Sequence, residues 1–351
     1  MHYKNQSWYL RKRPVGLLAS DDLSLESEDI TALADGHCLV KTRYLAMDPA
    51  TRGWIAEQGS YVEPLPLDTP VLGVTIGEVV ESRNERIEPG LVVAGVGPWA
   101  RYHVAGPEAI SPAATGALGV LAPMDTSSGH ELPMYLHAMG TSGATAYYGL
   151  VDIAQIQAGD AVLVSAAHGS VGSLACQIAR LKGAGRVVGI AGGADKCREV
   201  IDDFAADDCI DYKHTGDMSA AISKALPDGL DIYFDNVGGA ILEAAVDNLR
   251  QGARIAISGM ISQYNATGAG VGVRNLWQLL TRQARMQGFL ITAFLGTLAA
   301  KKGFAEISGW LKSGRMRAKI DERDMFDDIV TAYNLLYSGA NRGRLLIRVT
   351  E

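Results

Sequence analysis

The fold of this chain is decided by residues 160–196, DAVLVSAAHGSVGSLACQIARLKGAGRVVGIAGGADK. An apolar run over residues 161–165 predicts a strand, which ends in a turn of small residues. Leucine and isoleucine then recur at helical spacing over residues 173–181, which predicts a helix. Because a second apolar run follows at residues 187–191, the stretch predicts one strand–helix–strand unit of a parallel sheet.

Glycines at the first strand-to-helix junction of this unit indicate a nucleotide-binding loop. Gly169 and Gly172 let backbone N–H groups approach a pyrophosphate, and the following helix N-terminus favours its negative charge. The match to the fingerprint G-x-G-x-x-G is incomplete, because Ala167 stands where the first glycine would be. The flanking strands and helix supply the context that the motif requires, so we expect a bound dinucleotide. The alternative is a tight turn without a ligand.

The end of the second strand indicates which dinucleotide is bound. In NAD-binding folds, an acidic residue about 20 residues beyond the glycines binds the free ribose 2′-hydroxyl. Here Asp195 comes a few residues too late, and its neighbours Lys196 and Arg198 are basic. Because the ammonium group of Lys196 can pair with a 2′-phosphate, we expect NADP. The alternative for Lys196 is a solvated position in the first turn of a helix.

Length and composition are those of a globular protein with two domains. The chain has 351 residues, of which 48% are hydrophobic, enough for a large core. The formal net charge of −7 argues against a nucleic-acid partner. No apolar run approaches the length of about 20 residues that a membrane span needs, and the N-terminal residues lack a signal-peptide core. The four cysteines lie far apart without metal-binding spacing, so we expect reduced thiols and a cytoplasmic location.

The pattern of expected elements changes near Leu132. Before it, short apolar runs are separated by proline and glycine turns, which indicates a β-rich part. After it, strands alternate with helices, which predicts an open parallel sheet with helices on both faces. The expected strands are residues 37–44, 71–80, 91–96, 209–212, 230–234, 254–258, 285–291 and 344–349. The expected helices are residues 134–150, 242–249, 301–313 and 327–337.

Polar residues and glycines follow the carboxyl ends of these strands, where ligands of an open α/β sheet bind. Asn236 and Ser258 can hydrogen-bond a ribose or a phosphate, and the nearby glycines allow close backbone approach. The alternative for each residue is an ordinary turn at the end of a strand. Because they all fall on one rim of the sheet, together they favour a cofactor site.

With these motifs in order, the chain resembles the zinc-free medium-chain dehydrogenase/reductase superfamily. It is most similar to the leukotriene B4 12-hydroxydehydrogenase (prostaglandin reductase) family, which includes bacterial curcumin reductase and plant NADPH-dependent alkenal double-bond reductases. The resemblance covers nearly the whole chain. It rests on RPVG at 13–16, MDP at 47–49, RG at 52–53, GATAY at 143–147, the loop 167–172, Gly192-Gly193 with Lys196, DNVGG at 235–239, ISGMISQYN at 257–265, and Gly339, Asn341 and Gly343.

The resemblance implies a fold, a cofactor and an oligomeric state. A GroES-like β-rich domain of residues 1–127 and 305–351 would carry much of the substrate site. A Rossmann domain of residues 128–304, a doubly wound parallel α/β sheet, would be inserted within it. Members are commonly homodimers, so a homodimer is expected. The cofactor would be NADP(H), with contacts from Gly169, Ser170, Val171, Gly172, Lys196, Tyr212, Asn236, Ser258, Gly259, Met260, Tyr264, Phe289, Leu290, Ile291 and Asn341.

The sequence also indicates whether the chain carries the ligands of a zinc ion. Zinc-dependent relatives carry a cysteine after the second strand and a Gly-His-Glu run about 20 residues later, because a catalytic zinc needs three such ligands. Here residues 45–49 contain no thiol, and Val74 stands where the histidine would be. The cysteine cluster of a structural zinc is absent as well, so we expect no metal. His168, inside the phosphate loop, is expected to contact the cofactor or to face solvent.

Without a metal, reduction of an activated C=C bond is favoured over oxidation of an alcohol. NADPH would deliver hydride to the β-carbon of an α,β-unsaturated ketone or aldehyde. The charge that develops on the carbonyl oxygen needs a hydrogen-bond donor, and the α-carbon needs a proton. Tyr264 stands where the family's active-site tyrosine stands, and a phenol is a neutral donor at pH 7. We therefore expect Tyr264 to be catalytic; the alternative is a packing tyrosine.

The substrate pocket is expected to be apolar, with walls from Met47, Trp54 and Tyr61. Ala50-Thr51 stands where many relatives have Tyr-Met, so the pocket is expected to differ from theirs and to accept medium-size hydrophobic enones or enals. Two other functions remain open. One is a zinc-free NADPH:quinone reductase, and the other is a non-catalytic NADPH-binding protein.

Overall fold

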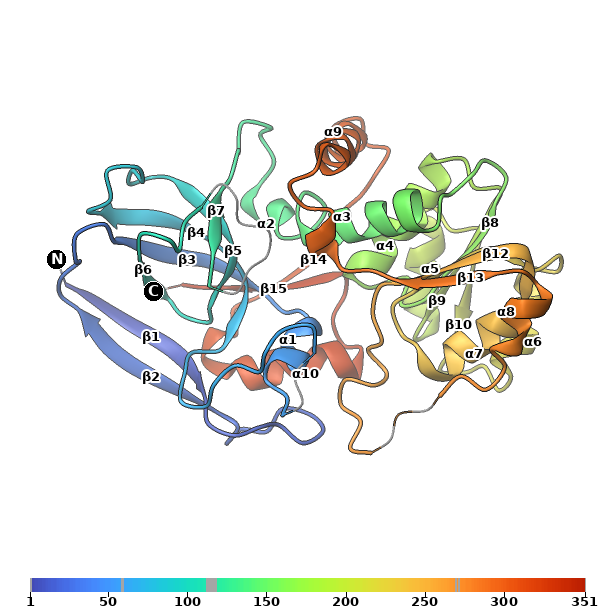
Figure 1. The fold of residues 1–351 in the computed structure, drawn as a ribbon, viewed down its shortest axis with the longest axis horizontal. Helices are drawn as coiled ribbons and strands as arrows, with labels where there is room; N and C mark the ends of the chain where they lie inside the picture. Colours follow the sequence, from blue (N-terminus) through green and yellow to red (C-terminus); the bar gives the residue numbers. More distant parts are fainter. Residues whose placement is uncertain (1, 58–59, 112–118, 269, 271, 351) are drawn as a thin grey trace. The chain divides into compact units, whose positions relative to one another are not determined.

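The computed structural model describes residues 2–57, 60–111, 119–268, 270 and 272–350. The chain divides into two compact units (Figure 1). The β unit consists of Met1–Leu136 and Ile320–Glu351, and the α/β unit of His137–Lys319 is inserted between these segments. The expected boundaries were 127/128 and 304/305. Both lie further along the chain in the structure, at 136/137 and 319/320. The second differs because helix α9, Leu298–Lys312, packs on helix α3, Thr141–Tyr148, and so belongs to the α/β unit.

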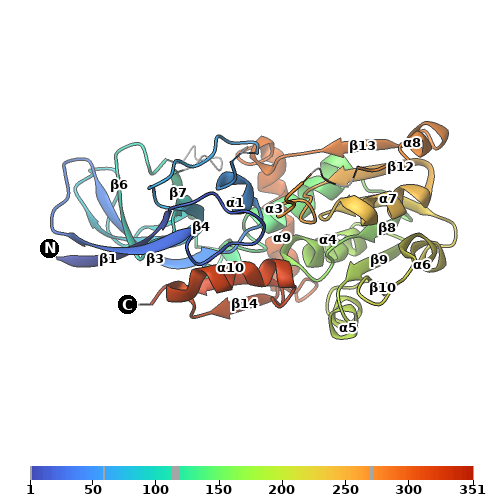
Figure 2. The same ribbon diagram turned by 90° about the horizontal axis from the view of Figure 1, so that it is seen from below.

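A six-stranded parallel sheet forms the centre of the α/β unit. The strand order is β10-β9-β8-β11-β12-β13, and Figure 2 shows this order from β13 at one edge to β10 at the other. The strands are β8 Ala161–Val164, β9 Arg186–Ala191, β10 Asp208–Asp211, β11 Leu230–Asp235, β12 Leu249–Ile257 and β13 Arg285–Gly288. The chain runs outward from β8 to β10 and then returns to β11, so the strand order reverses between β8 and β11. This confirms the doubly wound parallel sheet.

Helices connect these strands and lie on both faces of the sheet (Figures 1 and 2). Besides α3 and α9, they are α4 Ser170–Leu181, α5 Ala194–Asp202, α6 Met218–Ala225, α7 Gly239–Asp247 and α8 Trp277–Thr281. Helix α4 contacts β8 and β9 and also packs on α3, which explains why eight of its twelve residues are buried. All four residues of β8 are buried, as expected for a parallel strand covered on both faces.

The single helix expected over residues 134–150 is interrupted in the structure. Helix α2, Leu132–Tyr135, ends the first segment of the β unit, and α3 begins only after Gly140, whose backbone is extended. A π-helical turn, Gly149–Ile153, then follows α3. Gly143 explains the break, because a Cβ there would lie 1.9 Å from the carbonyl oxygen of Ala138. The chain therefore forms a turn over residues 136–139, where the periodicity predicted a continuous helix.

The β unit contains a seven-stranded sheet, a two-stranded hairpin and two further helices. The hairpin pairs β1, Tyr3–Leu10, with β2, Leu23–Ile30. The sheet has the order β14-β15-β3-β4-β5-β7, with β6 paired to β3. Its strands are β3 Cys38–Ala46, β4 Leu72–Ser82, β5 Val92–Pro98, β6 Tyr102–Ala105, β7 Leu121–Pro123, β14 Ile320–Arg323 and β15 Arg344–Arg348, and the helices are α1 Ala50–Trp54 and α10 Ile329–Ser338. The last strand, β15, pairs antiparallel with β3, so both ends of the chain build this unit.

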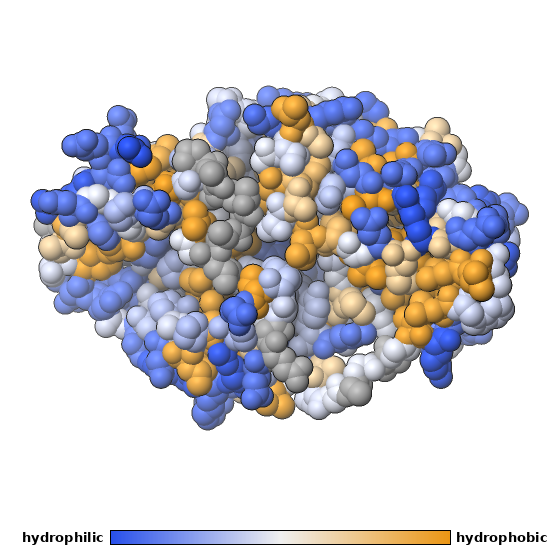
Figure 3. All heavy atoms as spheres, viewed as in Figure 1, coloured by the Kyte–Doolittle hydropathy of each residue, from blue (hydrophilic) through white to orange (hydrophobic). Residues whose placement is uncertain are grey.

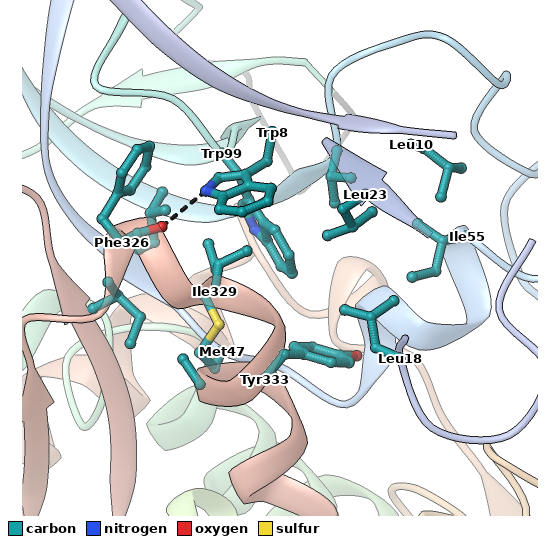
Figure 4. Packing of buried hydrophobic residues seen from close by; sticks show 14 of the residues in the cluster. Trp8, Leu10, Leu18, Leu23, Met47, Ile55, Trp99, Phe326, Ile329 and Tyr333 are labelled. Atoms are coloured by element: carbon teal, nitrogen blue, oxygen red, sulfur yellow. Dashed lines mark hydrogen bonds between the residues drawn. The ribbon is translucent and has the colours of Figure 1, made fainter. Parts of the chain in front are cut away.

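The core of the β unit joins side chains that are far apart in the sequence. In Figure 4, Trp8 of β1 lies against residues of the C-terminal segment, and its indole N–H donates to the carbonyl oxygen of Phe326 at 2.8 Å. Met47 lies beside Ile329 and Tyr333 of α10 in the same cluster. Within the described part of the chain, no helix has the length and apolar character needed to cross a membrane.

Candidate functional site

The turn between β8 and α4 has the geometry of an anion-binding loop. Ala166 adopts a left-handed conformation, with φ of 47°, and a Cβ on Gly172 would lie 2.2 Å from the Ala166 carbonyl oxygen. Only glycine therefore fits at position 172 in this turn. Gly169 is the N-cap of α4 and offers no side-chain oxygen to the first N–H groups of the helix. Those groups and the positive end of the helix dipole suit a phosphate.

The carboxyl end of β11 is held by one buried carboxylate. Asp235 accepts hydrogen bonds from the Tyr233 hydroxyl at 2.7 Å and from the N–H groups of Val237 and Gly238 at 2.9 and 3.0 Å. Burial raises the pKa of Asp235, although these hydrogen bonds act in the opposite direction. Asn236 follows directly, and its Nδ2 donates to the Ser165 carbonyl oxygen at 2.7 Å. The side-chain donor of Asn236 thus ties β11 to the end of β8, where the strand order reverses.

A cavity of about 660 Å³ lies at the carboxyl ends of β12 and β13. Its volume falls within the range of about 300–1,000 Å³ that is typical of small-molecule sites. Predicted site residues make up half of its wall, namely Ser258, Gly259, Met260, Tyr264, Phe289 and Leu290. The other half lies outside the predicted cofactor contacts and consists of Tyr148, Ile153, Ile257, Gln287, Gly288 and Ala293. Ile291, also a predicted contact, begins the short 3-10 turn Ile291–Ala293 next to this wall.

Tyr264 supplies the phenol of this cavity. Its hydroxyl oxygen accepts the backbone N–H of Met260 at 3.0 Å. A Cβ on Gly259 would lie 3.3 Å from the same oxygen, so the glycine allows this close approach. Because a hydroxyl that accepts one hydrogen bond keeps its own proton, Tyr264 can still donate to a ligand.

Aromatic rings form the apolar side of the cavity. Tyr148 stacks on Phe294 with ring centroids 4.6 Å apart and meets Phe289 edge-on at 5.6 Å. Phe289 in turn meets Phe234 of β11 at 6.3 Å. Tyr148 was not predicted as a site residue because it follows the GATAY motif inside an expected helix, where an aromatic residue usually packs in the core. Gly149 permits the arrangement, since a Cβ there would lie 2.5 Å from Phe234 and 2.7 Å from Phe289.

Lys196 and Tyr212 lie at the carboxyl ends of β9 and β10. The backbone N–H of Tyr212 donates to the Ala191 carbonyl oxygen at 3.0 Å. The half-exposed ring of Tyr212 lies over Gly192, where an added Cβ would approach it to 2.8 Å. Lys196 occupies the first turn of α5 and is half-buried. The structure therefore brings the two residues to the same rim as the loop after β8.

The expectation that His168 faces solvent was wrong, because its side chain is buried; a contact with the cofactor stays a prediction. It is only 3% exposed, and its Nε2 lies 2.6 Å from Oε2 of Glu199 on α5. Burial, opposed by that hydrogen bond and reinforced by the nearby charge of Lys196, lowers the pKa of His168. Glu199 also pairs with Lys319. Although burial opposes it, hydrogen bonds from His168 and Lys319 hold the pKa of Glu199 at about 2. This cluster fixes the phosphate loop to α5.

The remaining predicted site residues lie in the β unit. Met47 and Trp54 are buried in its core, whereas Tyr61 is 50% exposed and meets Trp54 edge-on at 6.4 Å. Of these three, Tyr61 is thus the one with a surface to offer a substrate, and the proposed pocket wall is limited to it. Asn341 follows α10, and its Nδ2 donates to the Gly343 carbonyl oxygen at 2.9 Å.

The described residues include no group of three or more His, Cys, Asp or Glu side chains arranged to hold a metal ion. His103 is half-buried, and desolvation of its ring lowers its pKa to about 4. Burial likewise raises the pKa of the Cys176 thiol to about 12. Both groups are therefore uncharged at neutral pH.

Two family models match the chain: the N-terminal domain of oxidoreductase over residues 6–112 and the zinc-binding dehydrogenase over residues 170–305. The chain is 33% identical to the NADPH-dependent curcumin reductase of Escherichia coli, with 99% of this chain and 97% of that protein covered. It is 34% identical to the NADP+-dependent 2-alkenal reductase of Nicotiana tabacum, with 89% and 87% covered.

A solved structure agrees with this relationship. The crystal structure of CurA from Vibrio vulnificus in complex with NADPH has a TM-score of 0.87 and 34% identity, with 99% of each chain covered. The match extends over both units rather than the nucleotide-binding fold alone. It confirms the family that the ordered motifs indicated. The chain therefore belongs to the medium-chain dehydrogenase/reductase family of oxidoreductases, in the branch that holds curcumin reductase and 2-alkenal reductase.

Proposed function

We propose that this protein is an NADPH-dependent reductase of the C=C bond of α,β-unsaturated ketones and aldehydes. The observation that carries the proposal is the cavity at the ends of β12 and β13, which Tyr264 lines together with the aromatic residues Tyr148 and Phe289. An enone needs both: a donor for its carbonyl oxygen and an apolar surface for its carbon skeleton. The relatives named for curcumin and 2-alkenal reduction support the same reaction class.

The cofactor in this proposal is NADP(H), which supplies the hydride when it is bound. The residues of the α/β unit fit it from end to end. The first turn of α4 suits the pyrophosphate, and Lys196 with Tyr212 suits the 2′-phosphate and the adenosine. The segments 258–260 and 289–291 lie at the rim where the nicotinamide would be held. At the pyrophosphate and adenosine end, a Cβ on Gly172 would collide with the backbone of Ala166, and a Cβ on Gly192 would collide with the ring of Tyr212.

Four residues of the cavity have a physical role in the proposed reaction. The Tyr264 hydroxyl donates to the substrate carbonyl oxygen, where negative charge develops as the β-carbon is reduced. The Met260 N–H, which donates to the same phenol oxygen, holds the hydroxyl in place and strengthens it as a donor. The phenol is also a suitable source for the proton that the α-carbon takes up. The rings of Tyr148 and Phe289 position the substrate and exclude water.

The test is the consumption of NADPH with a linear enone, compared with a benzoquinone, together with the variant Tyr264→Phe. We expect turnover of the enone to a saturated carbonyl product. We expect Tyr264→Phe to lower kcat/KM about a hundredfold, the cost of one donor to a developing oxyanion, with NADPH affinity within about twofold of wild type. Tyr147→Phe is the matched control, since it removes a hydroxyl that accepts from Lys182 outside the cavity. Turnover of the quinone alone, or binding without turnover, would replace the proposal with one of the two alternatives.

We also propose that the protein forms a homodimer through the β13 edge of the α/β unit. β13 is the last strand of the sheet, and three of its four residues are exposed. Beside it, α8 presents Trp277 and Leu280, which are 61% and 82% exposed. Figure 3 shows hydrophobic residues gathered over this part of the unit. An unpaired strand edge next to an apolar patch suits pairing with a second copy.

We further propose a cytoplasmic location. The described cysteines are free thiols, which supports this location.

A further inference from the structure

Three polar side chains form a hydrogen-bonded cluster at the first residue of α4. The Oγ of Ser170, the first residue of α4, lies 2.7 Å from the Oγ of Ser142 and 3.2 Å from Nδ1 of His137. Ser142 belongs to the first turn of α3, and His137 precedes that helix. His137 is fully buried, Ser142 is nearly so, and Ser170 is half-buried. The cluster exists because α3 packs directly on α4.

Burying these three polar side chains costs free energy of folding, so we expect their hydrogen bonds to serve a function. Burying a hydroxyl or an imidazole costs free energy that the hydrogen bonds only partly recover, and apolar side chains would join α3 to α4 without that cost. The cluster touches the one serine that stands at the start of the phosphate loop's helix. Its position therefore points to a role in ligand binding rather than in packing alone.

The positions of the protons in the cluster decide whether the Ser170 hydroxyl can donate a hydrogen bond to a ligand. A serine hydroxyl has one proton to donate and two lone pairs that accept. When Ser142 and Nδ1–H of His137 both donate to Ser170, both lone pairs are filled. The proton of Ser170 then has no acceptor within the cluster and is available to a ligand at the loop. When Ser170 instead donates to an unprotonated Nδ1, its proton is used inside the protein.

We propose that His137 and Ser142 are positioning residues that fix the Ser170 hydroxyl as a hydrogen-bond donor to the cofactor's pyrophosphate. His137 carries its imidazole proton on Nδ1 in this state. The inference rests on the proposed function only in taking NADP(H) as the ligand. It adds a side-chain donor to the backbone N–H groups of the loop, and it assigns a binding role to residues outside the cavity.

The experiment measures Kd for NADPH and, separately, for adenosine 2′-monophosphate, which lacks the pyrophosphate. We expect Ser170→Ala, Ser142→Ala and His137→Phe each to raise Kd for NADPH about tenfold, the value of one hydrogen bond to a charged acceptor. Binding of adenosine 2′-monophosphate should stay within about twofold, because that probe makes no contact with Ser170. In steady-state assays, KM for NADPH should rise while kcat at saturating NADPH is unchanged.

Two further variants separate positioning from packing. His137→Asn keeps a donating N–H near the position of Nδ1 and should restore most of the affinity that His137→Phe loses. Thr145→Val removes a hydroxyl of α3 that donates to the Thr141 carbonyl oxygen rather than to this cluster, and should leave both Kd values unchanged.

The double variant His137→Phe with Ser170→Ala gives the sharpest result. If His137 acts through Ser170, its replacement should add no further loss of NADPH affinity once the serine is gone. Additive losses, or equal weakening of both probes, would overturn the inference and leave the cluster a packing feature. Single variants that bind NADPH like the wild type would overturn it too, while the proposed function stands. A wild-type protein that fails to bind NADPH would instead remove the proposed function.

Discussion

The substitution Gly172→Ala tests whether the phosphate loop has room for a side chain at position 172. A Cβ at this position would lie 2.2 Å from the Ala166 carbonyl oxygen and 2.9 Å from the Ala167 Cα, both backbone atoms. Ordinary contact begins at 3.4 Å, so the turn must move by about 1.2 Å, the difference between 3.4 and 2.2 Å. Overpacking of this kind costs about 1–3 kcal/mol of unfolding free energy. The same displacement moves the N–H groups that would hold the pyrophosphate.

The two consequences are measured separately, by chemical denaturation and by titration with NADPH. We expect the midpoint of unfolding to fall and Kd for NADPH to rise at least about tenfold, since a displacement of about 1 Å has effects of this order or larger. Gly309→Ala in α9 is the matched control, because its added Cβ has no neighbour within 4 Å. That helix-interior change should stabilise the protein by about 0.5–1 kcal/mol. A Gly172→Ala protein that unfolds and binds NADPH like the wild type would refute the reasoning.

Three further predictions concern charge and assembly. Lys196→Ala should raise Kd for NADPH about tenfold and leave Kd for NADH unchanged, because only the 2′-phosphate loses its partner; equal effects on both would contradict the assignment. The pKa of Glu199 is held at about 2, below its ordinary 4.5, so its stabilising effect is present above pH 4.5 and is lost as the pH falls towards 2. In denaturation series over that interval, Glu199→Gln should be less stable than wild type at pH 7 by about 1–2 kcal/mol and should lose less stability on acidification. Leu280→Glu should convert the proposed dimer to a monomer in size-exclusion chromatography with light scattering, whereas a dimer that survives it must use another surface.

The α/β unit could be predicted largely from the sequence, because its signals are local. The strand at 161–164 is buried on both faces and is therefore apolar throughout, and the helix and turn beside it carry their own periodicity and glycines. The hairpin of β1 and β2 gave no such signal. In β1 four polar residues stand in a row at 4–7, without the alternation of a half-buried strand, and its pairing with β2 spans an intervening loop.

The side-chain surroundings of the site could not be predicted, because they depend on residues far away in the sequence. Met47 stands in a family motif, yet α10 near the C-terminus covers it and makes it a core residue. His168 stands in the phosphate loop, yet Glu199 from the next helix holds it inside. Tyr148 and Phe294 are separated by the whole parallel sheet in sequence, and their stacking becomes visible only in the folded chain.

The claim that the cavity reduces a C=C bond is tested most directly with NADPH deuterated at the transferred position of nicotinamide C4. The reaction is run with a linear α,β-unsaturated aldehyde, and mass spectrometry and NMR locate the deuterium in the product. We predict a saturated aldehyde that carries deuterium on the β-carbon. An allylic alcohol with deuterium on the former carbonyl carbon would contradict the account.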